Sequence, residues 1–146
     1  MEMTLRKAQS SDIGFLIELR DLTMRRYLEA VGMPTGREDY LQRVRYEFEH
    51  ARIIECDGVA AGLFKAVYLT EQHQWYIFQI QIHPDYQNRK IGRQVIQSVI
   101  DQARTIGASV GLSVIKSNPA QRLYLRLGFK PVGESEAEYE MLLQPE

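Results

Sequence analysis

The sequence predicts an α/β fold in which a mixed central β-sheet is flanked by helices. Segments of alternating or β-branched residues, typical of strands, are interleaved with segments whose apolar residues recur every three or four positions, as in helices. The expected order is strand, helix, helix, three strands, helix, strand, helix and two strands, which fits a barrel or a helical bundle poorly. A chain of 146 residues is long enough for one core, so residues 1–146 are expected to form a single domain.

The N-terminal part of the chain predicts one strand and two helices. Residues 4–8 alternate apolar and polar side chains, and residues 10–12, Ser-Ser-Asp, are good N-cap residues for a helix that begins near Ile13. Residues 31–36 end this helix with two glycines and a proline, and a shorter second helix is expected over residues 40–48. The apolar stripe of the first helix is Leu16, Ile17, Met24, Tyr27, Leu28 and Val31, and Arg20, Arg25 and Glu29 alternate with it.

The middle of the chain predicts three strands. Asp57-Gly58 stands between two β-rich runs in residues 51–69, which is the strongest short-range signal for a β-hairpin. Residues 75–82 are aromatic and β-branched, so a third, central strand is expected there. This strand should end at His83-Pro84, because proline cannot donate to the ladder of hydrogen bonds.

The C-terminal part predicts two helices alternating with strands. A helix begins inside residues 86–92 and closes at Gly107, and residues 109–116 form the next strand. A short helix opens at Asn118 and ends at Gly128, and two last strands flank an acidic turn. The stripe of the longer helix is Ile91, Val95, Val99, Ala103 and Ile106, and that of the shorter one is Leu123, Tyr124 and Leu127.

The composition excludes several classes of function. Apolar residues make up 45% and charged residues 25% of the chain, as in soluble globular proteins, and the formal net charge of -1 gives no reason to expect nucleic-acid or membrane partners. Cys56 is the one cysteine, so neither an intramolecular disulfide nor a multi-cysteine metal site can form. Without an apolar run of signal-peptide or membrane-span length, the protein is expected to be cytoplasmic.

The stretch YQNRKIG, residues 86–92, is the first candidate for a binding site. A polar turn between a strand and a helix leaves backbone N–H groups without internal partners, and such groups attract phosphate. Gln87, Asn88, Arg89, Lys90 and Arg93 add donors and positive charge there. The alternative is an ordinary basic helix start, since a lone glycine is a weak signal.

Three local patterns and the order of elements resemble the GNAT superfamily of acyl-CoA-dependent N-acyltransferases over nearly the whole chain. Residues 87–92 are similar to the family's signature of Gln or Arg, two residues, Gly, one residue, and Gly or Ala, with Lys90 in place of the first glycine. Residues 82–86, IHPDY, resemble the family's approach to that loop. Residues 118–129, NPAQRLYLRLGF, resemble its Asn, Ala, Leu-Tyr, Gly-Phe segment and are the most specific match.

The resemblance implies a GNAT-like acyl-CoA N-acyltransferase fold, a single acyltransferase domain and acetyl-CoA as co-substrate. It implies that the strand edge at Ile80, Gln81 and Ile82 pairs with the pantetheine amides. It implies that Asn118 contacts the cofactor chain, although the spacing of six from Asn118 to Tyr124 is one shorter than in many members. The implied pyrophosphate ligands are the backbone N–H groups of Asn88, Arg89, Lys90, Ile91, Gly92 and Arg93, which follow Gln87.

Lys90 is where the sequence departs from the family's pattern. Glycine permits positive φ or close approach of the backbone to a ligand, and lysine does neither cheaply. Lysine costs little only if the backbone at position 90 is already helical. Its ammonium could then lie near the 3′-phosphate of coenzyme A, a hypothesis that rests on position alone.

Tyr124 is, by the resemblance, the general acid that protonates the thiolate of coenzyme A. A thiol pKa of about 8.5 and a phenol pKa of about 10 make this transfer reasonable. The alternative is a core tyrosine, because Tyr124 shares a helical face with Leu123 and Leu127.

A general base is harder to assign. Many relatives place a glutamate on the central strand, but the corresponding residue is Tyr76, and Gln79 and Gln81 cannot take a proton at neutral pH. A water relayed to backbone carbonyls, Glu29, or an amine already deprotonated in solution all remain open. His83 could titrate near neutrality, but a turn role beside Pro84 is favoured.

Other residues could shape an acceptor site. Trp75, Tyr76 and Phe78 could line it, although aromatic residues on a central strand usually fill the core. Residues 32–39 lie where the family builds its acceptor wall, and Arg37 or Glu38 could read substrate charge. Cys56 is expected to be a small strand residue, since family chemistry is direct transfer without an acyl-enzyme.

The predicted function is N-acetyl transfer from acetyl-CoA to a primary amine of a small-molecule or peptide acceptor, without a metal. A non-catalytic acyl-CoA-binding or sensing module is the main alternative, because of Lys90 and the missing strand glutamate. A DNA-associated module using Arg20, Arg25 and Arg26 fits poorly with the near-neutral charge. A homodimer through the C-terminal strands would be unsurprising in this family, and no side chain identifies the acceptor.

Overall fold

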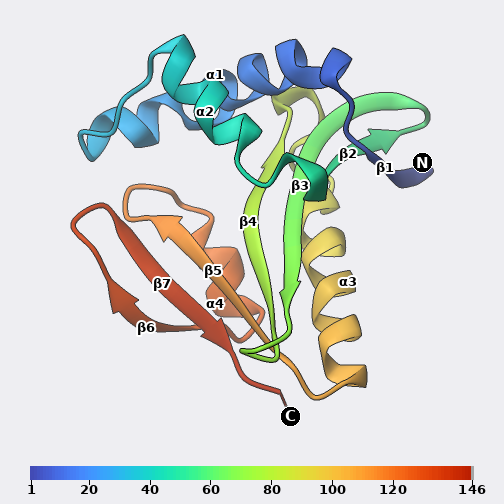
Figure 1. Cartoon of the computed structure of the whole chain (residues 1–146), viewed down its shortest axis with the longest axis vertical. Coiled ribbons are helices and arrows are strands. Elements are labelled where there is room, and N and C mark those ends of the chain that lie inside the picture. The colour runs from blue at the N-terminus through green and yellow to red at the C-terminus, as the bar shows by residue number, and fades with distance from the viewer. Residues whose placement is uncertain (146) are drawn as a thin grey trace.

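The computed structural model describes residues 1–145, which fold around a mixed β-sheet with helices on both faces (Figure 1). Within these residues the sheet has seven strands in the order β1-β2-β3-β4-β5-β7-β6, and the β4–β5 pairing is parallel while the other pairings are antiparallel. The predicted fold class and element order are therefore confirmed. The strands are β1 (Met3–Lys7), β2 (Ala51–Cys56), β3 (Val59–Leu69), β4 (Gln74–Ile82), β5 (Ser109–Ile115), β6 (Lys130–Glu134) and β7 (Glu138–Leu143).

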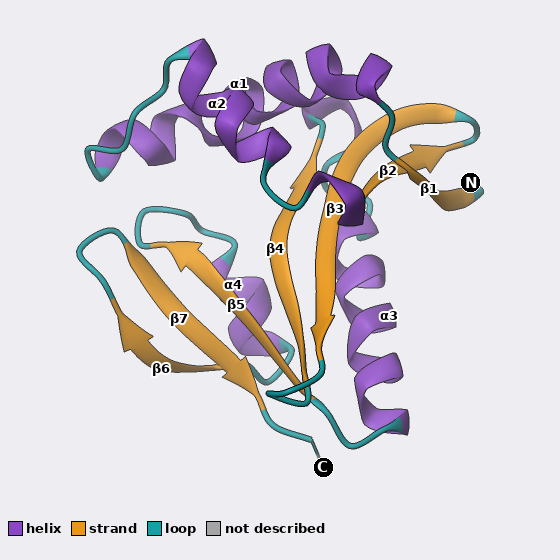
Figure 2. Cartoon of the chain, in the orientation of Figure 1, coloured by secondary structure: helices purple, strands orange, loops and turns teal. Residues whose placement is uncertain are grey.

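The helices cover the two faces of the sheet, as the colouring by secondary structure makes clear (Figure 2). In β2, the adjacent residues Ile53 and Ile54 point to opposite faces, with Ile53 in the core under α1 and α2 and Ile54 in the core under α3. Residues 10–48 thus supply one helical layer, and residues 91–105 supply the other. The helices are α1 (Ile13–Ala30), α2 (Arg37–Arg45), α3 (Ile91–Thr105) and α4 (Gln121–Arg126).

The β2–β3 hairpin forms where Asp57-Gly58 predicts it. Both residues have positive φ, 51° and 80°, which a two-residue turn of this hand requires at its two central positions. The turn lies at the end of the hairpin, and Cys56 just before it is buried with its pKa raised by burial. Cys56 is thus the small strand residue that was expected.

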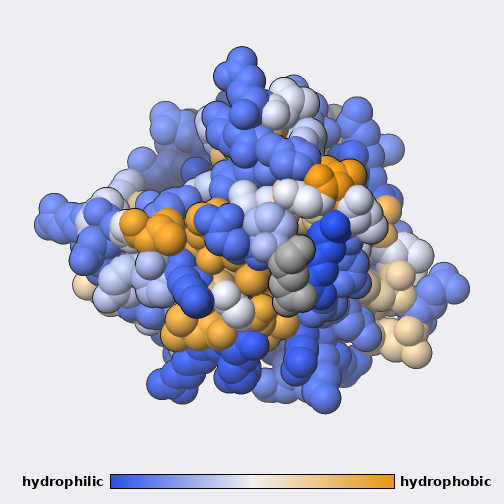
Figure 3. Space-filling view, turned by 90° about the horizontal axis from the view of Figure 1, so that it is seen from below, coloured by the Kyte–Doolittle hydropathy of each residue, from blue (hydrophilic) through white to orange (hydrophobic). Residues whose placement is uncertain are grey.

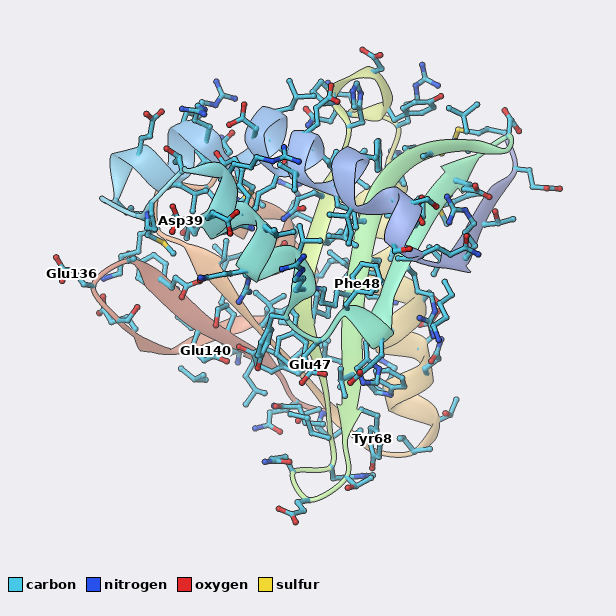
Figure 4. All side chains as sticks on the ribbon, turned by 45° about the horizontal axis from the view of Figure 1, so that its top comes forward. Asp39, Glu47, Phe48, Tyr68, Glu136 and Glu140 are labelled. Carbon is cyan, nitrogen blue, oxygen red and sulfur yellow. The ribbon has the colours of Figure 1, made fainter. Side chains whose placement is uncertain are left out.

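The second helix, Arg37–Arg45, begins and ends earlier in the chain than the predicted range of 40–48. α2 begins at Arg37, where Asp39 accepts a hydrogen bond from the N–H of Gly36 at 3.2 Å (Figure 4), and it ends at Arg45 rather than near Phe48. The ammonium of Lys65, on β3, donates to the carbonyls of Arg43, Val44 and Tyr46 at 3.1, 3.2 and 2.5 Å. These carbonyls at the end of the helix are therefore satisfied by a side chain from the sheet, and the helix need not continue.

A β-bulge at Phe78 controls the shape of the sheet. Lys65 pairs with Gln79 and Ala66 with Ile77, so Phe78 is the extra residue on β4. A bulge bends its strand and reverses the faces to which later side chains point. Ile77 packs in the core under α3, and beyond the bulge Ile80 and Ile82 pack against that core while Gln79 and Gln81 lie on the opposite face.

The parallel strands β4 and β5 separate beyond the bulge. They pair only from Gln74–Ile77 to Ser109–Leu112, and the rest of each strand diverges, as the ribbons show (Figure 1). The edge of β4 at Ile80–Ile82 that faces β5 has no strand partner among the described residues. The sheet is thus open where β4 ends, and α1 and α2 lie across that end.

The opposite end of the molecule, seen from below, is mostly hydrophilic around a group of hydrophobic residues (Figure 3). The loop between β6 and β7 carries Glu136 at the side of the molecule (Figure 4). Every residue of β6, the strand at the sheet's edge, is exposed. Among residues 1–145 no helix has the length and apolar character needed to cross a bilayer.

Candidate functional site

Two cavities lie at the open end of the sheet. The first, of about 320 Å³, lies between the diverging parts of β4 and β5 and reaches α1 and α2. The second, of about 410 Å³, lies between α1, the end of β4, the start of α3 and α4. The residues that line both cavities are Met24, Ile80, Gln81, Asn118 and Tyr124. The two cavities therefore adjoin, and these residues mark their junction.

Tyr124 lies at this junction and also in the core. Its side chain is buried, with 7% exposed, and its ring meets that of Phe129 edge-on at 6.0 Å. Burial raises the pKa of the phenol to about 12, so it stays protonated over the whole physiological range. Among residues 1–145, none forms a hydrogen bond with its hydroxyl. Tyr124 is thus a core residue that also lines both cavities, and its role as general acid stays a prediction.

The turn before α3 adopts left-handed backbone at two residues that are not glycine. Asn88 has φ of 65° and Lys90 has φ of 62°, and Lys90 is the N-cap of α3. Lysine would cost little at position 90 only if the backbone there were in the right-handed helical region, and it is not. Asparagine tolerates the left-handed region because its side chain bonds locally, whereas lysine is strained there.

The turn is held to the end of β4. The side-chain amide of Gln87 donates to the carbonyl of Ile82 at 3.0 Å, and Arg89 lies over the ring of Tyr86 at 5.3 Å. The first hydrogen bond of α3 runs from the N–H of Gln94 to the carbonyl of Lys90. The preceding N–H groups at the start of the helix have no intrahelical partner and point beyond its end.

The sequence-predicted binding residues divide into two groups. One group lines the second cavity, while the other belongs to the turn and the first residues of α3, where Ile91 is buried in the core and the others are exposed. Asn118 also closes the turn before α4, because its side-chain oxygen accepts from the N–H of Ala120 at 2.9 Å. The first group is Ile80, Gln81, Ile82, Gln87, Gly92 and Asn118, and the second is Asn88, Arg89, Lys90, Ile91 and Arg93.

The three aromatic residues of β4 have different places. Trp75 packs against the core, as expected, but Tyr76 and Phe78 line the first cavity, so the core interpretation is wrong for these two. The hydroxyl of Tyr76 donates to the carboxylate of Glu140 at 2.9 Å, and Ser113 donates to the same carboxylate at 2.5 Å. Burial and the neighbouring carboxylate raise the pKa of Tyr76 to about 12.

Several predicted acceptor-site residues lie elsewhere. Glu29 is exposed, and neither it nor Arg37 nor Glu38 lines either cavity; from the loop at 32–39 only Met33 does so. His83 accepts from the N–H of Asp85 at 3.1 Å, in the turn role that was favoured.

Sequence reasoning missed Arg20 and Arg43, which both line the first cavity. Arg20 was read as alternating with the apolar stripe of α1, but it is buried with 9% exposed. Arg20 lies three residues after Ile17 and four residues before Met24, which places it on the apolar stripe itself. A charged residue on an apolar stripe was the signal available in the sequence. Arg43 carried no comparable signal, because its place depends on how α2 packs.

Comparison with known proteins identifies the family. The model of the acetyltransferase (GNAT) family matches residues 16–129. Spermidine N(1)-acetyltransferase of Escherichia coli (strain K12) is 29% identical over 103 residues, which cover 68% of this chain and 55% of that protein. An amino-acid acetyltransferase of Shewanella oneidensis is 30% identical over 105 residues, covering 72% of this chain and 22% of that protein. The chain thus spans about half the length, or less, of these relatives.

Solved structures share the fold at low identity. PaiA N-acetyltransferase from Thermoplasma acidophilum, in complex with coenzyme A, superposes with a TM-score of 0.77 at 16% identity over 99% of both chains. Spermidine N-acetyltransferase from Vibrio cholerae, in complex with CoA and spermine, gives 0.70 at 21% identity over 97% of this chain and 95% of that one. At these identities the similarity establishes the fold.

Proposed function

Because the chain belongs to the acetyltransferase (GNAT) family, we propose that it is an acyltransferase domain that transfers an acetyl group from acetyl-CoA to a primary amine. The observation that carries the proposal is the position of Tyr124 where the two cavities meet. One cavity takes the thioester arm of acetyl-CoA, the other takes the acceptor, and a proton donor lies between them.

The second cavity is assigned to coenzyme A. The partnerless edge of β4 at Ile80–Ile82 offers backbone groups to the pantetheine amides, as an added strand would. The N–H groups at the start of α3, together with the helix dipole, suit the pyrophosphate. The left-handed backbone at Lys90 supports this assignment, since the turn keeps the conformation that glycine usually provides there.

The acceptor amine attacks the thioester carbonyl directly. A C–N bond forms and the C–S bond breaks, and backbone N–H groups stabilise the oxyanion of the tetrahedral intermediate. Tyr124 gives its proton to sulfur as the thiol leaves. The burial that raises the pKa of Tyr124 to about 12 also disfavours a bare thiolate in the same place, so protonation of sulfur is coupled to departure.

No side chain of the described site is assigned as the general base. Gln79 and Gln81 cannot accept the proton, and Tyr76 is held by Glu140 with its own pKa raised. The carboxylate of Glu138, which also lines the first cavity, interacts with the charge of Arg20. We therefore assign the attack to the fraction of the amine that is already deprotonated in solution. Water relayed to backbone carbonyls then carries away the proton released after attack.

The alternative is a module that binds acyl-CoA without turning it over, favoured by Lys90 and by Tyr76 in place of a glutamate. Release of free thiol from acetyl-CoA in the presence of a panel of amines separates the two. Amine-dependent release with an N-acetylated product in the mass spectrum supports the enzyme. Calorimetric binding of acetyl-CoA without release for any amine supports the binding module.

A further inference from the structure

The wall of the first cavity nearest α1 and α2 carries an excess of positive charge. Arg20 comes from α1 and Arg43 from α2, and both line the cavity together with Glu138 of β7. Among the described lining residues, two cationic side chains thus stand against a single carboxylate. Neither arginine forms an ion pair with any carboxylate of residues 1–145.

The neighbours of the two arginines orient them without neutralising them. With its amide oxygen turned toward the guanidinium groups, Gln79 accepts from Arg43 Nε at 3.1 Å and from Arg20 Nη1 at 3.2 Å. Arg43 also donates through Nη2 to the carbonyl of Phe78 at 3.2 Å. These acceptors are neutral dipoles, so the pair keeps a net positive charge, which the field of Glu138 offsets only in part at Arg20.

A third cation lies close behind the pair. Lys65 is 1% exposed, and its ammonium is surrounded by backbone carbonyls at the end of α2. Burial, followed by the field of Arg43, lowers the pKa of Arg20 to about 10. Burial, then Arg43, then Arg20, lowers the pKa of Lys65 to about 8. Both pKa values are lowered because burying like charges close together, away from water, costs free energy. A bound anion would reduce this cost.

The size of the cavity limits what this anion can belong to. A volume of about 320 Å³ is at the lower end for small-molecule sites. Tyr124 lies on the lining of the same cavity, so a ligand that reaches the arginines also approaches the proposed transfer point. A polyamine, by contrast, would bring further positive charge to a wall that already carries the buried Arg20 and the half-buried Arg43.

We infer that the acceptor is a small amine that carries a carboxylate, an amino acid, whose carboxylate is bound by Arg20 and Arg43 while its amine faces the junction at Tyr124. The inference rests on the proposed function and names its substrate class. Guanidinium groups bind carboxylates through paired, charge-assisted hydrogen bonds. Arg20 and Arg43 are therefore specificity-determining residues.

The test compares acceptors that differ only in this carboxylate. Thiol release from acetyl-CoA is measured for glycine, L-alanine, L-glutamate and L-lysine, for the carboxamides glycinamide and L-alaninamide, and for spermidine. Each kcat/KM is expressed per unprotonated amine, because the amide and the acid differ in amine basicity. The kcat/KM of each acid is expected to exceed that of its amide by about 10- to 100-fold, which is the range for a hydrogen bond to a charged group.

Arg43→Gln provides the matched variant, and Arg45→Gln is its control on the same helix, at an exposed residue outside both cavities. Arg43→Gln should raise KM for the preferred acid about 10- to 100-fold and leave KM for its amide unchanged. Arg45→Gln should change neither. Should Arg43→Gln unfold, the comparison of acids with amides on the wild-type protein decides the question alone.

The outcomes separate this inference from the proposed function. Amides or spermidine acetylated with a kcat/KM equal to or above that of the acids overturn the inference and leave the acetyltransferase standing. Absence of thiol release with every amine counts against the proposed function. Calorimetry with succinate then tests the anion site. Succinate binding to the wild type that is lost in Arg43→Gln supports the site. Absence of succinate binding to the wild type overturns it.

Discussion

The hydroxyl of Tyr76 on β4 donates a hydrogen bond to the carboxylate of Glu140 on β7, 2.9 Å away, and so links two strands on either side of β5. Ser113 of β5 donates to the same carboxylate at 2.5 Å. The link lies beside the first cavity, just before β4 and β5 separate. Tyr76 is thus held by a structural bond between strands.

Tyr76→Phe should destabilise the fold without stopping catalysis. The variant loses the bond to Glu140 while Ser113 keeps its own, so the free energy of unfolding in urea should fall by about 1–2 kcal/mol. Because Tyr76 is not the base, kcat should stay near the wild-type value. A double-mutant cycle with Glu140→Gln isolates the pair. A large loss of kcat in a variant of unchanged stability would instead make Tyr76 part of the chemistry.

The stability of the protein should rise with pH through the titration of Lys65. Its pKa is lowered from the ordinary 10.5 to about 8 in the folded state. Below pH 8 both states are protonated and the buried charge carries its full cost; between about 8 and 10 the unfolded state holds more protons, so the folded state gains. The free energies of unfolding in urea are measured for the wild type and for Lys65→Met. The value for the wild type, relative to that of the variant, should rise between about pH 8 and 10.

Lys65→Met serves here as the reference because it lacks the titrating group but has similar length. Its unfolding free energy at any one pH is lower, since three carbonyls of α2 and the residue after it lose their donor. The test therefore depends only on how the difference in unfolding free energy between the two proteins changes with pH. A difference that is flat from pH 7 to 10 would show that Lys65 titrates at its ordinary pKa.

Lys90 should carry a charge effect and a backbone effect of opposite sign. Lys90→Gly relieves the left-handed backbone, which costs a non-glycine residue about 1–2 kcal/mol, so the variant should unfold at higher urea. Loss of the ammonium should weaken acetyl-CoA binding at low salt. Lys90→Asn, which tolerates the same backbone, provides the control without the glycine. Unchanged or tighter acetyl-CoA binding in both variants would show that the ammonium contributes nothing.

The pH profile of the reaction should have no falling limb in the accessible range. The phenol of Tyr124, with its pKa raised to about 12, remains a proton donor up to that value. The unprotonated fraction of the acceptor grows with pH, so kcat/KM should rise and level off as the amine loses its proton. Stopped-flow thiol release from pH 6 to 10 measures this. A fall of kcat itself, rather than of the substrate binding that depends on Arg20 with its pKa of about 10, would place the proton donor elsewhere.

The parts of the fold that local chemistry controls were predictable from sequence. Asp57-Gly58 gives the hairpin because its two residues suit positive φ, and the stripes of α1 and α3 set which faces are buried. The end of α2 was not predictable, because Lys65 binds its carbonyls from another part of the chain. The bulge at Phe78 was not predictable either, since it is a property of the pairing of β4 with β3.

The same division applies to the site. The strand edge, the turn before α3 and Tyr124 follow from contiguous motifs, and the structure brings the strand edge, Gln87 of the turn and Tyr124 to adjoining cavities. The positions of Tyr76 and Phe78 on the cavity wall depend on the separation of β4 from β5. Arg20 could have been noticed as a charge on an apolar stripe, whereas Arg43 reaches Phe78 only through the packing of α2 on the sheet.

The most direct test of the account is Tyr124→Phe, which removes one hydroxyl from the junction of the two cavities and keeps the ring that packs beside Phe129. Acetyl transfer is measured under single-turnover conditions, and acetyl-CoA affinity by calorimetry on the same preparation. We expect the rate to fall by about 10²-fold while the Kd for acetyl-CoA stays nearly unchanged. A rate equal to that of the wild type, or an equal loss of rate and affinity, would contradict the role of Tyr124 as proton donor to the leaving thiol.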